Sequence, residues 1–141
     1  MARNNSFFRS GHLTFAQQIG RMSASHSGFR PKFNRKGVFW VGQLQPSPVS
    51  EKYVVRIDYT LRKRPKVWVL EPALRRRRVD QKIPHTFYDG SVCLHVHADW
   101  TPGMFIADTI IPWLSLWLYH YETWHAIDAW LGGGHEPGAG K

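Results

Sequence analysis

Cysteine is scarce in this sequence, which has a single copy, Cys93, among 141 residues. One cysteine cannot form a disulfide within the chain, and it leaves no C-x-x-C pair for a redox or zinc motif. No basic head followed by an apolar run of the secretory kind opens the sequence. These absences predict a protein of the reducing cytoplasm.

Long apolar runs and nucleotide-binding motifs are also missing. The longest apolar run, residues 110–119, contains Pro112 and is followed directly by His120 and Glu122. It falls short of the ~20 residues that a membrane-spanning helix needs, so no membrane segment is expected. The chain has neither a G-x-x-x-x-G-K-[ST] loop nor a dinucleotide fingerprint. We therefore expect no cofactor, and any carboxylate substrate would have to be activated by another protein.

Acidic residues are few, 10 against 19 lysines and arginines, which gives a formal net charge of +9. This excess favours acidic partners, such as nucleic acid, anionic lipid or the acidic face of a protein. The basic clusters at residues 62–66 and 75–78 are the candidates for phosphate contacts. A run of charge is more often a solvated face, so nucleic acid is the less favoured partner.

Apolar residues make up 43% of the chain and aromatic residues 14%, which is enough for one folded core. We expect a flexible basic arm over residues 1–11, a single domain over residues 12–132 and a disordered tail over residues 133–141. Within the domain, Thr14 and Gln17 form a capping box that predicts a helix ending near residue 25. Residues 27–36 have the composition of a basic connector.

Hydrophobic patterning then predicts strands followed by helices. Residues 38–44, 53–59 and 67–70 are expected strands, and their short links indicate an antiparallel meander. Apolar residues recur at helical spacing after residue 102, which predicts a main helix with Pro112 in its first turn. A separate last helix is expected over residues 122–131, ended by Gly132. This order is typical of an α+β fold.

The only cysteine lies in a motif with a known counterpart. The stretch Ile83-Pro84-His85-Thr86-Phe87-Tyr88-Asp89-Gly90-Ser91-Val92-Cys93-Leu94, with Trp100-Thr101-Pro102 after it, resembles the active-site signature of ubiquitin-conjugating enzymes. That signature reads His-Pro-Asn, then a Gly shortly before Ile-Cys-Leu, then Trp-Ser-Pro. The resemblance implies a UBC-like fold with an N-terminal helix, an antiparallel β-meander, a cysteine-bearing loop and C-terminal helices. It also implies that Cys93 carries an acyl group as a thioester, which requires a reachable thiol.

The resemblance assigns roles to residues around Cys93. Ile83 stands where the family has histidine, and His85 stands where it has the asparagine implicated in stabilising the oxyanion. An imidazole N–H can donate a hydrogen bond, so His85 is expected to inherit this role. His97 and Asp99 are the candidates for deprotonating the attacking amine, since they lie close to Cys93 in sequence.

The segment after Cys93 resembles bacterial members of the family, which occur in cyclic-oligonucleotide antiphage signalling systems (CBASS). This resemblance implies a donor protein with a conjugatable C-terminus, namely a cGAS-like nucleotidyltransferase, together with a lysine-bearing acceptor. It also implies an activating enzyme in those systems that have one.

Three other interpretations of the same residues stay open. A lone cysteine is often only a small buried apolar residue, and Ile83 and His85 would then mark an inactive protein-binding scaffold of the same fold. If residues 91–97 form a strand, Cys93, His95 and His97 project to one face and are candidate zinc ligands. The basic clusters leave a nucleic-acid-binding domain as the third interpretation.

Overall fold

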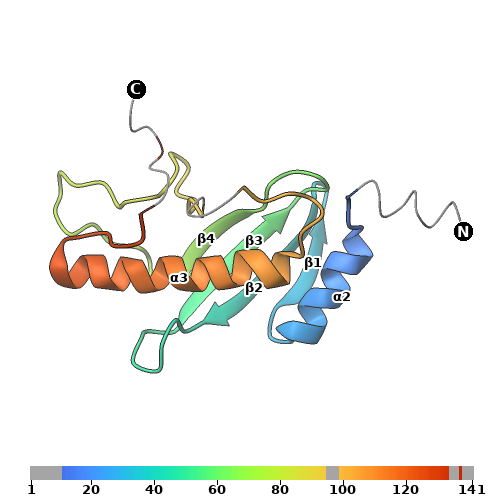
Figure 1. Cartoon of the computed structure of the whole chain (residues 1–141), viewed down its shortest axis with the longest axis horizontal. Coiled ribbons are helices and arrows are strands. Elements are labelled where there is room, and N and C mark those ends of the chain that lie inside the picture. The colour runs from blue at the N-terminus through green and yellow to red at the C-terminus, as the bar shows by residue number, and fades with distance from the viewer. Residues whose placement is uncertain (1–10, 95–98, 134–136, 138–141) are drawn as a thin grey trace, which may run out of the picture.

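The computed structural model describes residues 11–94, 99–133 and 137. Most of the expected arm and most of the expected tail therefore lie outside the described residues. The described elements follow the α+β order predicted from the sequence (Figure 1): α2 (Phe15–Ser25), β1 (Arg30–Asn34), β2 (Gly37–Leu44), β3 (Tyr53–Tyr59), β4 (Lys66–Glu71) and α3 (Ile106–Ile127).

Helix α2 begins at the predicted capping box. The Gln17 N–H donates to Thr14 Oγ1 at 3.1 Å, and the Thr14 N–H donates to Gln17 Oε1 at 2.9 Å. Two of the backbone donors that a helix start leaves unpaired are thus satisfied by local side chains. The prediction of a helix ending near residue 25 is confirmed.

The four strands form one antiparallel sheet in the order β1-β2-β3-β4. In β3 every second residue is buried, which confirms the alternation seen in the sequence. The prediction that residues 27–36 are only a connector is wrong, because β1 pairs with β2 and Lys32 lies opposite Phe39. The strand was missed because it lies at the sheet edge and its side chains are mostly exposed, so it carries no apolar alternation.

Helix α3 is one continuous helix of 22 residues where the sequence predicted two. Its buried stripe runs without a break to Trp124, so no boundary separates a main helix from a last one. Pro112 lies inside the helix and not in its first turn, with its ring exposed. Asp128, in the left-handed conformation at φ 59°, ends the helix in place of the predicted Gly132.

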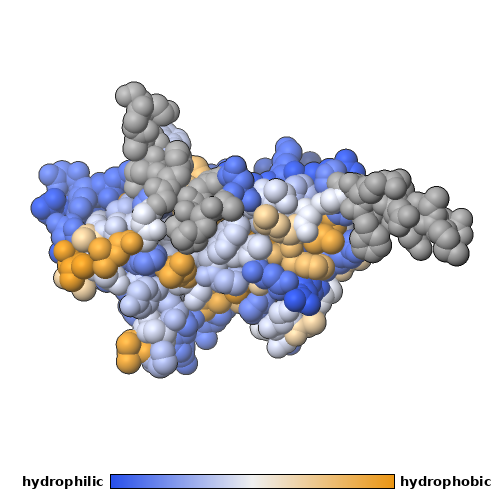
Figure 2. All heavy atoms as spheres, in the orientation of Figure 1, coloured by the Kyte–Doolittle hydropathy of each residue, from blue (hydrophilic) through white to orange (hydrophobic). Residues whose placement is uncertain are grey.

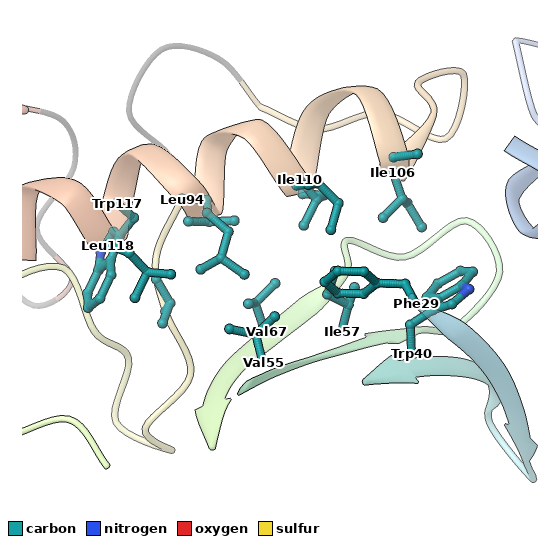
Figure 3. Packing of buried hydrophobic residues seen from close by; sticks show 14 of the residues in the cluster. Phe29, Trp40, Val55, Ile57, Val67, Leu94, Ile106, Ile110, Trp117 and Leu118 are labelled. Atoms are coloured by element: carbon teal, nitrogen blue, oxygen red, sulfur yellow. The ribbon is translucent and has the colours of Figure 1, made fainter. Parts of the chain in front are cut away.

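The core lies between α3 and the face of the sheet that this helix crosses (Figures 1 and 3). Leu94 and Ile110 point from the upper layer toward Val55 and Val67 of the sheet (Figure 3). Elsewhere, Figure 2 shows that apolar residues reach the viewed face in separate patches, one of them over the C-terminal end of α3. A continuous core under α3 therefore holds the sheet and the cysteine-bearing segment together.

Gln18 joins α2 to the start of α3. Phe105, at the N-cap of α3, makes no capping side-chain bond. The fully buried Gln18 side chain instead donates to the Met104 carbonyl and accepts from the Ile106 N–H, both at 2.9 Å. A residue 88 positions away thus satisfies one of the backbone donors at the start of α3.

Candidate active site

The segment that carries Cys93 begins with a tight turn. Thr86 and Val92 form an isolated antiparallel bridge, and the Gly90 N–H donates to the Phe87 carbonyl at 2.9 Å within the turn between them. Gly90 has φ of 88°, a conformation that glycine adopts without a Cβ clash. This glycine of the signature is therefore the point at which the backbone reverses before Cys93.

Backbone hydrogen bonds join the chain at Cys93 to the segments that flank it. The Val92 N–H donates to the Val67 carbonyl of β4, and the Cys93 N–H donates to the His85 carbonyl, each at 2.8 Å. The His85 carbonyl also accepts a bond from Trp117 Nε1 of α3 at 3.2 Å. The sheet edge, the preceding segment and α3 thus fix the position of the Cys93 backbone.

The Cys93 side chain is enclosed. Cys93 is buried, with only 1% of its surface exposed. The prediction of a reachable thiol is wrong for this structure, because the fold buries the residue beside the core. A buried thiol reacts only after the groups that cover it move aside.

The backbone of His85 lies next to that of Cys93. His85 is 6% exposed, and its φ of 55° places it in the left-handed region that favours glycine and asparagine. Its ring lies against Trp130, with ring centroids 4.9 Å apart. His85, which stands at the asparagine position of the signature, is thus a buried ring that packs against the segment after α3.

The other predicted site residues are only partly accounted for. Asp99 is exposed and pairs with Arg64 at 3.0 Å, which ties the segment after Cys93 to the β3–β4 link. His95 and His97 lie outside the described residues. Among the residues that the structure describes, no three His, Cys, Asp or Glu side chains lie close enough to hold a metal ion. The zinc set of Cys93, His95 and His97 stays a prediction.

A second ion pair holds the turn before Cys93. Lys66 Nζ lies 2.6 Å from the Asp89 carboxylate, which also accepts bonds from the Ser91 backbone and hydroxyl. The bond from Lys66, followed by those from Ser91, holds the pKa of Asp89 well below its usual range. Asp89 therefore stays ionised and keeps the turn joined to the start of β4.

An apolar pocket of about 500 Å³ opens between the start of β4, residues 87–94 and the N-terminal half of α3. Val92 and Leu94, the two neighbours of Cys93, line it. Local patterns could not predict this pocket, because its walls come from segments that are separated in the chain. The ion pair of Lys66 with Asp89 was missed for the same reason.

Comparison with protein families gives a match to the model described as type II CBASS E2 protein, over residues 18–137. The chain belongs to the type II CBASS E2 protein family. Comparison with curated proteins gives no match. Membership confirms the resemblance to ubiquitin-conjugating enzymes and assigns the chain an E2-like role in CBASS, a bacterial antiviral defence.

In this CBASS E2 protein the arginine run at residues 75–78 contacts the C-terminal end of α3. The Arg75 carbonyl accepts a bond from His125 Nε2 at 2.9 Å, and Arg77 pairs with Asp128 at 3.1 Å. Burial lowers the pKa of His125, so the neutral ring that donates to Arg75 is favoured. These contacts indicate a structural role for part of the run.

One further sequence expectation concerns membranes. Within the described part of this E2 protein, no helix is both long and apolar enough to cross a membrane.

Proposed function

We propose that this CBASS E2 protein carries a donor protein as a thioester on Cys93 and transfers it to an amine. The donor would be the cGAS-like nucleotidyltransferase of the same defence system, joined through its C-terminal carboxylate. The observation that supports this proposal most is the position of Cys93. It follows the Gly90 turn, and its N–H is bonded to the residue at the family's asparagine position.

The chemistry needs a donor that is already activated, because this chain has no nucleotide-binding motif. The Cys93 thiolate attacks the carbonyl carbon of a donor thioester held by an activating enzyme. A new carbon–sulfur bond forms, and the thiolate of that enzyme leaves. In the second step an amine attacks the same carbonyl, its proton passes to a base, and the Cys93 thiolate leaves.

His85 is proposed to stabilise the oxyanion that forms in both steps. Its backbone carbonyl accepts a hydrogen bond from the Cys93 N–H, so the backbones of the two residues are held side by side. The His85 ring packs against Trp130, so this contact is part of the environment of the proposed oxyanion. Asp99, which pairs with Arg64, and His97 stay the candidate bases for the second step.

Burial of the thiol makes access a required step of this mechanism. The bonds of Val92 and Cys93 are made by their backbone N–H groups and not by the sulfur. Side chains that cover Cys93 can therefore move while the segment stays anchored to β4. We expect thiol alkylation of the isolated protein to be slow and to become faster when donor and activating enzyme are added.

The test is adduct formation with the nucleotidyltransferase, activating enzyme and ATP of the same system. Wild type should give an adduct that reducing agent removes, Cys93→Ser an ester that resists thiols, and Cys93→Ala none. For His85, glycine and asparagine both tolerate its left-handed backbone, so they are matched replacements. We expect His85→Gly to slow transfer about 100-fold and His85→Asn to retain it. Adduct formation by Cys93→Ala would refute the proposal.

The alternative is an E2-like scaffold that binds partners without acyl transfer. Two observations favour it specifically: the 1% exposure of Cys93, and the replacement of the family's histidine and asparagine by Ile83 and His85. Under this alternative no thiol-sensitive adduct forms with any donor, and Cys93→Ala supports antiphage defence as well as wild type does.

A further inference from the structure

The pocket beside the cysteine-bearing segment has the composition of a binding site. Phe87, Tyr88, Trp100 and Trp113 supply aromatic surface, while the neighbours of Cys93 and one α3 residue supply aliphatic surface. Its volume of about 500 Å³ falls within the range of ~300–1,000 Å³ that is usual for ligand pockets. A ligand for such walls must present a large apolar group.

The rim adds a charge preference. Arg64 and Lys66 both line the pocket, and their side chains are 46% and 61% exposed. Each has one carboxylate partner, Asp99 or Asp89, but a guanidinium has five N–H donors and an ammonium has three. Both side chains can therefore bind a second carboxylate without losing the first. With a net charge of +9 on the chain, the complementary ligand is acidic.

The location relates the pocket to Cys93. Val92 and Leu94 line it, and Cys93 between them does not. The pocket therefore lies beside the cysteine-bearing segment but not at the sulfur itself. A chain joined to the sulfur would need several residues, at ~3.3 Å each, to reach the pocket.

We infer that this pocket binds a large apolar side chain of the donor protein, flanked by acidic residues and situated several residues before the donor's C-terminus. The inference rests on the proposed function, since it takes the donor to be the protein that Cys93 carries. Anchoring the donor here keeps its terminus beside the thiol both before and after the thioester forms.

The first test uses indole-3-propionate as the probe, because it joins an aromatic ring to a carboxylate. In ¹H–¹⁵N spectra of the full chain, we expect it to shift the amide signals of Val92 and Leu94 and the indole signal of Trp113. The dissociation constant should be about tenfold lower than that of 3-ethylindole, which lacks the carboxylate. Lys66→Glu should remove this difference, and Lys32→Glu, an exposed lysine on β1, should keep it. No shifts at these residues, or equal binding by Lys66→Glu, would overturn the inference.

The second test uses the donor itself and separates the two proposals. On a Cys93→Ala background, which forms no thioester, we expect Trp113→Ala to weaken donor binding about tenfold. Tyr88→Ala should weaken donor binding as well. Because the Tyr88 side chain is fully exposed, a folding defect would not explain this loss.

Binding that depends on the pocket, with no adduct on wild-type Cys93, would refute the thioester proposal and keep the pocket. The opposite outcome is that wild type forms the adduct and that Trp113→Ala and Tyr88→Ala, with Cys93 intact, form it at the same rate and bind the donor equally well. This outcome would refute donor binding in the pocket and keep the thioester proposal.

Discussion

The core under α3 and the turn before Cys93 are held by different kinds of contact. Leu114 and Leu118 of α3 are fully buried against the sheet, in a pattern that repeats along the helix. The segment of residues 83–94 enters the core only at its end, through Val92 and Leu94. The turn before Cys93 is positioned by backbone bonds and by the ion pair of Lys66 with Asp89. The core therefore has many replaceable contacts, and the site has a few specific ones.

Stability and activity can therefore be changed separately, by substitutions in the core and in the turn before Cys93. Burial of apolar surface stabilises the domain in proportion to area, wherever the residue lies. An exposed ion pair contributes little to stability, yet it sets the position of a turn next to the reactive residue. Substitutions in the two regions should thus affect different measurements.

The largest effect on stability is expected in the core. Leu114→Ala should lower the free energy of unfolding by about 2–5 kcal/mol, because it removes a fully buried side chain and leaves a cavity. Leu116→Ala, on the same helix but 39% exposed, is the matched control and should cost less than about 1 kcal/mol. Urea denaturation measures both. Equal losses would contradict the placement of the core.

A smaller loss is expected at the junction of α2 and α3. Gln18→Leu should lower the free energy of unfolding by about 1–3 kcal/mol, because it leaves the Ile106 N–H and the Met104 carbonyl buried without their partner. Gln43→Leu, at an exposed position of β2, should change it by less than about 0.5 kcal/mol. If Gln18→Leu is as stable as wild type, the side chain does not serve as a cap for α3.

The smallest effect on stability is expected at the site. Lys66→Ala should cost less than about 1 kcal/mol, because the pair with Asp89 is largely exposed. It should still slow adduct formation, since the turn before Cys93 loses its link to β4. Asp89 has a lowered pKa, so its contribution is present above the usual aspartate value of ~3.9 and is lost as the pH falls below it.

An NMR titration of the Asp89 carboxyl in both proteins measures this pKa directly. In Lys66→Ala the midpoint should rise toward the usual value. An unchanged midpoint, or an unchanged rate of adduct formation, would show that Lys66 does not hold the turn.

Much of the fold could be predicted from local patterns. The capping box of Thr14 and Gln17 gave the start of α2, and the alternation in residues 53–59 gave β3 with its observed bounds. Both signals are local, because they come from residues a few positions apart in the chain. The edge strand β1 was missed because exposed edge residues show no apolar alternation. The single α3 was missed because a separate last helix was expected to begin at Glu122.

Glu122 illustrates the physical reason for that error. Its carboxylate accepts bonds from the Ser50 and Tyr53 hydroxyls at 2.7 and 2.8 Å, so a charged residue continues the helix while it faces the β2–β3 link. Burial and this bond raise the pKa of Tyr53. Partners 69 and 72 positions away cannot be read from the helix itself.

Residue types at short spacing were enough to predict the fold class and to reveal the family signature. Only the tertiary structure decided that Cys93 is buried, that Lys66 and Arg64 hold the two ends of its segment, and that a pocket lies beside it. Burial and ion pairing arise between residues that the folded chain brings together, and no local pattern encodes which distant segments will meet.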